Sequence, residues 1–175
     1  MGRGTLLLAV VLAFGSALAL LFEDRGVAPL EVGDVAPPLG LPRIGPGEPL
    51  DIEDARGQVV FLNFWATWCK PCEDEMPAME RLHRELGPKG LAMWAVSVDD
   101  RAEPVAEFRE RLGLTFPILH DPAKEASERY DARRFPESWI VGRDGRLVAR
   151  FIGPREWDSP VYLEQIAALL DETGP

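Results

Sequence analysis

The hydrophobic pattern changes from a strand-like run to a helical spacing in the middle of the chain. Residues 58–66 are almost entirely apolar and do not alternate, which is typical of a parallel strand covered on both faces. From Cys72 onward apolar residues recur at intervals of three and four, and Gly87 ends the series. The pattern therefore predicts a central strand followed by an amphipathic helix. The helix should begin near Pro71, and Pro77 inside it should kink it.

Strands and helices alternate through the rest of the chain. Apolar runs predict strands at 91–98, 115–119, 138–141 and 146–152, and helical spacing predicts helices at 104–112, 122–130 and 160–170. Asp121 and Pro122 are expected to cap and open the second of these helices. Arg143-Asp144-Gly145 is a hairpin signal between the last two strands. The order predicts an α/β domain in which helices flank one sheet.

The start of the chain predicts a membrane segment. Leu6 to Phe22 form a run of 17 residues without a charge, close to the lower limit of roughly 17–25 that spans a bilayer. With Arg3 before the run, we expect residues 1–22 to be an uncleaved signal anchor. The domain would then lie on the extracytoplasmic (periplasmic) face of the cytoplasmic membrane. The alternative is cleavage after Ala17-Leu18-Ala19, followed by secretion.

Composition divides the remainder into a tether and one domain. Residues 23–48 are rich in proline and glycine and are expected to form a tether and the loosely structured start of the domain. Residues 49–175 would be the domain itself, which is long enough to bury a sizeable core. The net charge of −10 argues against binding to nucleic acid and is compatible with basic or neutral protein partners.

The only two cysteines of the chain lie at the junction of the central strand and its helix. Cys69 and Cys72 have the spacing of a pair that closes into a disulfide and reopens. Unpaired N–H groups and the positive end of the helix dipole stabilise a thiolate at this position. We therefore expect Cys69, at the accessible helix entrance, to attack a partner. Cys72, one turn inside, would resolve the mixed disulfide.

Neighbouring residues are expected to tune this chemistry. Lys70 adds positive charge that favours the Cys69 thiolate, whereas the acidic pair at 73–74 opposes it, and the sequence does not decide between the two effects. Pro71 stiffens the turn between the sulfurs. Trp68 is expected to form an apolar rim that contacts a partner.

The segment from Val59 to Cys72, continued by Glu75 and Pro77, resembles the thioredoxin superfamily. It is most similar to the membrane-tethered branch of TlpA/ResA/CcmG(DsbE)-type thiol:disulfide oxidoreductases. The resemblance extends from about Val32 to about Leu170. It implies a thioredoxin-like fold with a central mixed sheet flanked by helices, an N-terminal hairpin near residues 39–52, and a strand–helix insertion at residues 115–130.

The same resemblance implies further site residues. Asn63 stands where plain thioredoxins have a buried aspartate, so Glu75 is implied as the proton carrier; a first-turn glutamate that only complements the helix dipole is the alternative. Phe135-Pro136 looks like the loop that holds a cis proline beside the active disulfide, where its backbone would pair with an extended substrate. Glu137 is similar to the CcmG-type variant, whereas Phe135 is bulkier than the residue expected there.

The leading functional interpretation is an extracytoplasmic thiol:disulfide oxidoreductase that reduces disulfides of exported proteins. The resemblance implies a membrane thiol carrier as electron donor and apocytochromes c among the substrates. We expect no cofactor other than the Cys69–Cys72 disulfide, and no metal. One alternative is a thiol peroxidase of the peroxiredoxin type, disfavoured because Phe64 stands where a proline would be sought. The other is a Cu(I)-binding chaperone, disfavoured by Pro71 and by the lack of a third soft ligand apart from Met76.

Overall fold

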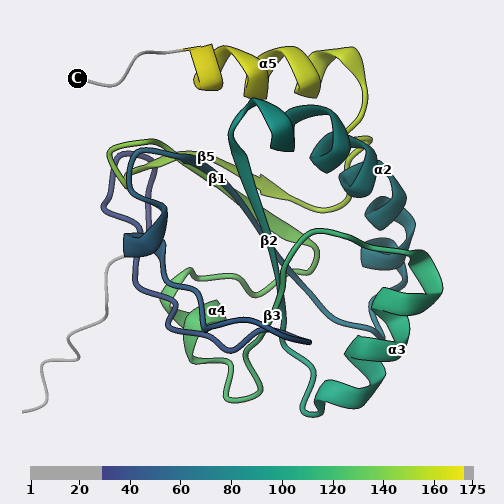
Figure 1. Cartoon of the computed structure of the whole chain (residues 1–175). Coiled ribbons are helices and arrows are strands. Elements are labelled where there is room, and N and C mark those ends of the chain that lie inside the picture. Colours follow the sequence, from purple (N-terminus) through teal and green to yellow (C-terminus); the bar gives the residue numbers. More distant parts are fainter. Residues whose placement is uncertain (1–28, 172–175) are drawn as a thin grey trace, which may run out of the picture.

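The computed structural model describes residues 29–171, which form one mixed sheet with helices on its faces (Figure 1). The strands are β1 (Val59–Trp65), β2 (Leu91–Ser97), β3 (Ile118–His120), β4 (Glu137–Val141) and β5 (Leu147–Ile152). The helices are α2 (Lys70–Leu86), α3 (Ala102–Leu112), α4 (Glu125–Arg129) and α5 (Pro160–Asp171), with short 3-10 helices η1 (Ile52–Ala55) and η2 (Gly87–Lys89). The strand order is β3-β2-β1-β4-β5, parallel from β3 to β1 and antiparallel from β1 to β5. The predicted central strand and thioredoxin-like fold are confirmed.

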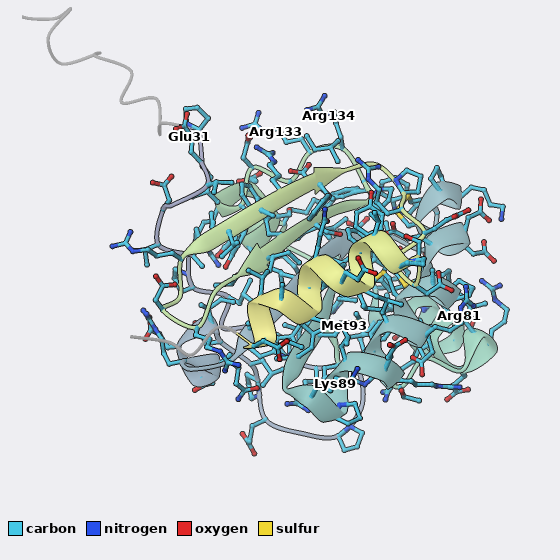
Figure 2. The ribbon with its side chains drawn as sticks, turned by 90° about the horizontal axis from the view of Figure 1, so that it is seen from above. Glu31, Arg81, Lys89, Met93, Arg133 and Arg134 are labelled. Carbon is cyan, nitrogen blue, oxygen red and sulfur yellow. A yellow bond between two sulfur atoms is a disulfide. The ribbon has the colours of Figure 1, made fainter. Side chains whose placement is uncertain are left out.

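The central strand is buried on both faces because its side chains alternate between two apolar cores. Phe61 and Trp65 pack with residues of α2, α3 and α5. Leu62 and Phe64 face the other way, toward α4 and the segment that precedes β1. Seen from above, α5 lies in front of the strands (Figure 2). The sheet is thus a rigid support for the loop and helix that follow β1.

The segment before β1 is part of the folded unit, although its composition indicated a loose tether. It bridges to one end of the sheet through Val35, opposite Arg146, and to the other through Arg43, opposite Leu119. The expected N-terminal hairpin is reduced to a single bridge between residues 41 and 50. The boundary placed between residues 48 and 49 therefore falls inside the fold.

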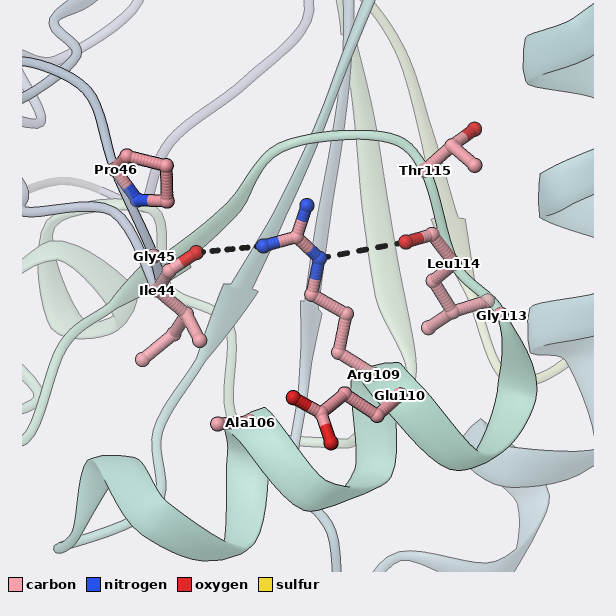
Figure 3. Close-up of a pocket in the computed structure, with 9 residues that line it drawn as sticks. All are labelled: Ile44, Gly45, Pro46, Ala106, Arg109, Glu110, Gly113, Leu114 and Thr115. Carbon is pink, nitrogen blue, oxygen red and sulfur yellow. Dashed lines mark hydrogen bonds between the residues drawn. The ribbon is translucent and has the colours of Figure 1, made fainter.

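A side chain of α3 fixes this segment in place. The Arg109 guanidinium reaches across a pocket of about 490 Å³ and donates hydrogen bonds to the carbonyls of Ile44 (2.9 Å) and Leu114 (3.3 Å) (Figure 3). The arginine thereby ties the N-terminal segment to the loop that leads into β3.

Two predicted boundaries in this region were wrong. The strand expected at 115–119 is the shorter β3, and the helix expected from Pro122 begins only at Glu125. The delay arises because Lys124 has a φ of 61°, a left-handed conformation that interrupts helical backbone. Asp121 still acts as a cap, since its carboxylate accepts a hydrogen bond from the N–H of Ser127 at 2.9 Å.

The predicted membrane anchor at 1–22 lies outside the described residues. Within residues 29–171, no helix has the length and apolar character needed to cross a bilayer.

Candidate active site

The two cysteines form a disulfide where β1 gives way to α2. Cys69 is the N-cap residue of α2, and its Sγ accepts a hydrogen bond from the N–H of Cys72 at 3.3 Å. That N–H would stabilise a thiolate at Cys69 once the disulfide is reduced. Cys69 is 7% exposed and Cys72 is fully buried. Cys69 is thus more enclosed than expected of an accessible helix entrance, but it is the more exposed of the two cysteines.

A buried carboxylate at the end of β2 holds the loop that carries Cys69. Asp99 accepts hydrogen bonds from the backbone N–H and the hydroxyl of Thr67, at 2.9 and 2.6 Å, and from the hydroxyl of Ser97 at 2.8 Å. Asp99 could not be assigned a role from the sequence, because its contact with Thr67 is made across 32 residues.

Glu75, predicted as the proton carrier, is buried below the disulfide-bearing turn. It is 2% exposed. One oxygen accepts from Asn63 Nδ2 (2.9 Å), and the other accepts from the Arg155 N–H (3.1 Å) and from Trp157 Nε1 (3.0 Å). Burial raises the pKa of Glu75 from its ordinary 4.5 to about 7, although these three donors pull it down. A carboxyl group with this pKa both takes and returns a proton near neutral pH.

Asn63 connects this carboxylate to the neighbouring strand. Its Nδ2 also lies 2.9 Å from Ser138 Oγ, and the two residues are direct partners in the β1–β4 register. Its Oδ1 is buried and has no hydrogen-bond partner among residues 29–171. The position therefore contributes a neutral donor to Glu75 rather than an acid of its own.

Trp68, predicted to contact a partner, lies beside the loop before β4. As predicted, the Phe135–Pro136 peptide bond is cis. Trp68 is 68% exposed, and its ring lies 6.1 Å from that of Phe135. An exposed indole beside the cysteine pair, against a second aromatic ring, is suited to contact an apolar part of a partner.

Each of the charges expected to tune Cys69 has an ion-pair partner. Lys70 forms an exposed ion pair with Asp74, one turn along α2. Glu73 pairs with Arg111 of α3 at 2.7 Å. Charges of both signs near Cys69 are therefore each compensated by a neighbour. Pro71 occupies the first turn of α2, where its missing N–H leaves no helical bond unmade.

Glu137 differs from its expected place in substrate binding. Its side chain is buried, and one oxygen accepts from Arg150 Nε at 2.7 Å. Arg150 also donates to the backbone carbonyl of Asp131 at 2.8 Å and stacks on the Trp139 ring at 4.9 Å. The side chain of Glu137 thus anchors β4 beside the cis proline and does not face the surface.

The described part of the chain holds no group of three or more histidine, cysteine or acidic side chains placed to bind a metal ion.

Comparison with known proteins identifies the family. Residues 32–150 match the AhpC/TSA family. The chain is 37% identical to the thiol-disulfide oxidoreductase ResA of Bacillus thuringiensis over 107 residues, which is 61% of this chain and 62% of that relative's length. It is 36% identical to ResA of Geobacillus kaustophilus over 145 residues, covering 83% of this chain and 82% of the relative.

A solved structure carries the same fold. A protein of Chlorobium tepidum, assigned as thiol:disulfide interchange protein DsbE, superposes with a TM-score of 0.74 at 30% identity and covers 81% of this chain and 99% of its own. The chain therefore belongs to the AhpC/TSA family and, within it, to the thioredoxin-like proteins that include the ResA thiol-disulfide oxidoreductases.

Proposed function

We propose that this chain is an extracytoplasmic thiol:disulfide oxidoreductase that reduces disulfides of exported proteins. The observation that carries the proposal is the Cys69–Cys72 disulfide at the N-terminus of α2, with the buried carboxyl group of Glu75 on the same helix. Glu75 follows Cys72 by three residues, and side chains at that spacing lie on one face of a helix, about 5–6 Å apart. An attacking thiol, a resolving thiol and a proton carrier are thereby brought together.

The reaction moves two electrons from the dithiol to a partner disulfide. The Cys69 thiolate attacks one partner sulfur, which forms a mixed disulfide and releases the other sulfur as a thiolate that takes a proton from water. Cys72 then gives its proton to the Glu75 carboxylate, and its sulfur attacks Cys69 Sγ. The partner's second thiolate leaves, Cys69 and Cys72 are joined, and Glu75 carries the proton until it is released.

The substrate class and location are supported by the sequence and by similarity. An apolar run precedes the domain at residues 6–22, and a chain with no further cysteine has no structural disulfide that an oxidising compartment could scramble. The ResA relatives are named as thiol-disulfide oxidoreductases. We propose apocytochromes c among the substrates and a membrane thiol carrier as the electron donor.

The first test is the reduction potential of the Cys69–Cys72 pair, measured against a thiol buffer. A value near or below about −270 mV supports a reductant, whereas a value near about −120 mV would mark an oxidant that inserts disulfides. Reduction of a model protein disulfide tests the activity directly. Faster consumption of peroxide than of protein disulfide would favour the peroxidase alternative, and stoichiometric Cu(I) binding by the reduced protein would favour the chaperone. An alkaline phosphatase fusion that is inactive would contradict the extracytoplasmic location.

A further inference from the structure

The turn between β5 and α5 contacts both the proton carrier and the partner-binding loop. The backbone N–H of Gly153 donates to the carbonyl of Pro136 at 2.8 Å. Two residues on, the Arg155 N–H donates to Glu75, and the Trp157 indole donates to the same carboxylate oxygen. A short stretch of chain, residues 153–157, therefore holds Glu75 from the side opposite its own helix.

Within this turn, the direction of the Trp157 indole is fixed by packing. The side chain is fully buried, and its ring makes edge contacts with Phe61 (4.7 Å, 88°) and Phe151 (5.2 Å, 90°). Tyr162 of α5 packs on it at 5.0 Å. A ring held from three sides cannot turn its N–H to another acceptor. Because a buried N–H without a partner is unfavourable, the ring and the carboxylate hold each other in place.

The Glu75 carboxylate is stabilised largely by neutral hydrogen-bond donors rather than by nearby positive charges. Arg155 faces it from the turn, but its guanidinium is engaged by the carbonyls of Gly153 (3.2 Å) and Pro154 (2.9 Å). β1 contributes the neutral Asn63. On the solvent side, Asp74 of α2 and the turn residue Glu156 line a pocket of about 310 Å³ that Glu75 also borders. Neither of these two side chains brings a positive charge to Glu75.

We propose that Trp157 is a positioning residue for proton transfer: its indole N–H fixes the Glu75 carboxylate and stabilises the ionised form that accepts the proton of Cys72. The inference rests on the proposed function, because Trp157 is assigned as the residue that positions the proton carrier, Glu75. The pocket beside Glu75 then gives the proton its way to solvent, so Glu75 can discharge while a partner covers Trp68 and Cys69.

The test compares Trp157→Phe with Tyr162→Phe in the full chain. Phenylalanine at 157 keeps an aromatic ring in the cluster and removes the N–H, whereas Tyr162→Phe alters the same cluster without touching a donor to Glu75. The pKa of Glu75 is read by NMR from its labelled carboxyl carbon, and the resolving step is followed against pH. Loss of the indole donor should raise the pKa by about one pH unit, a tenfold change in the ionisation constant. Tyr162→Phe should leave it unchanged.

A second variant separates positioning from general damage. In a Glu75→Gln background, Trp157→Phe should no longer shift the pH dependence of the resolving step, because the carboxyl group that Trp157 stabilises is absent. An equal effect in both backgrounds, or an equal pKa change in Tyr162→Phe, would overturn the proposal.

If Trp157→Phe does not fold, the contact can be tested through the indole N–H of Trp157 in the wild-type protein. Its N–H resonance should shift with pH, with the same midpoint as Glu75, and a resonance constant from pH 5 to 9 would refute the contact. These NMR readouts do not need enzyme turnover. A wild-type protein that fails to reduce disulfides therefore refutes the proposed function and leaves the test of Trp157 standing.

Discussion

The Glu75→Gln variant separates the charge of the buried carboxylate from its shape. Burial raises the pKa of Glu75 from 4.5 to about 7, so an ionised Glu75 destabilises the folded state by about 3 kcal/mol at pH 7 and above. Between pH 4.5 and about pH 7, Glu75 keeps its proton in the folded protein, whereas the same residue has lost it in the unfolded chain. The free energy of unfolding of the wild type should therefore fall as pH rises through this window and level off above it.

Glutamine can occupy the same hydrogen-bond positions. Its oxygen can accept from the Arg155 N–H and from Trp157 Nε1, as Glu75 Oε2 does. The NH₂ group of the glutamine would then face Asn63 Nδ2, which is also a donor. Rotation of the Asn63 amide would place Oδ1 there as an acceptor, and this oxygen has no other partner among the described residues. We expect the variant to lie within about 1 kcal/mol of the wild type at pH 5. At pH 9 it should be more stable than the wild type by about 3 kcal/mol.

The assay is urea unfolding of the oxidised proteins across pH 4 to 9, together with the rate of mixed-disulfide resolution. Glu75→Gln should slow resolution by about 10²-fold or more and remove the inflection near pH 7. Glu156→Gln is the matched control, since Glu156 is exposed at the same pocket, and it should change neither quantity. A wild-type stability that is flat from pH 4.5 to 7, or an inflection that survives in Glu75→Gln, would refute the argument.

Four further substitutions test other parts of the site and fold. Cys69→Ser should abolish disulfide reduction, while Cys72→Ser should accumulate mixed disulfides that non-reducing gels and mass spectrometry detect; activity retained in Cys69→Ser would overturn the assignment of the attacking thiol. Thr67→Val removes the hydroxyl bonded to Asp99 at 2.6 Å and should reduce the free energy of unfolding by about 1–3 kcal/mol, whereas an unchanged urea midpoint would show that the bond contributes nothing. Arg109→Met keeps an unbranched apolar stem but removes two donors to backbone carbonyls, and we expect a loss of about 1–3 kcal/mol, with unchanged thermal unfolding as the contrary result.

The sequence predicted those parts of the fold that depend on local periodicity. β1, α2 and α5 were placed within a residue or two, because each has a long apolar pattern and clear end signals. The start of α4 was missed because the left-handed Lys124 is not a residue that favours this conformation. The segment before β1 looked loose because proline and glycine dominate it. Ala36, Leu39 and Leu41 are nevertheless buried in the core that faces α4, and no local pattern reports such contacts.

The candidate site divides in the same way. The cysteine pair could be predicted from its spacing, whereas the cis proline and the assignment of Glu75 were implied by the resemblance to the thioredoxin superfamily. Trp157 and Asp99 could not, since they meet their partners across 82 and 32 residues. Glu137 was misplaced because its position after Pro136 says nothing about which way its side chain turns.

The position of the acid on α2 explains why its partners come from so far away. Asn63 of β1 bonds to Glu75 of α2 and to Ser138 of the neighbouring strand β4. The other oxygen of Glu75 meets the turn after β5, where it accepts from the Arg155 N–H and from the Trp157 indole. That turn also bonds to Pro136. A change at residues 153–157 is therefore expected to alter both the Glu75 carboxylate and the loop that holds the cis Pro136, whereas a change at Asn63 acts on the carboxylate and β4.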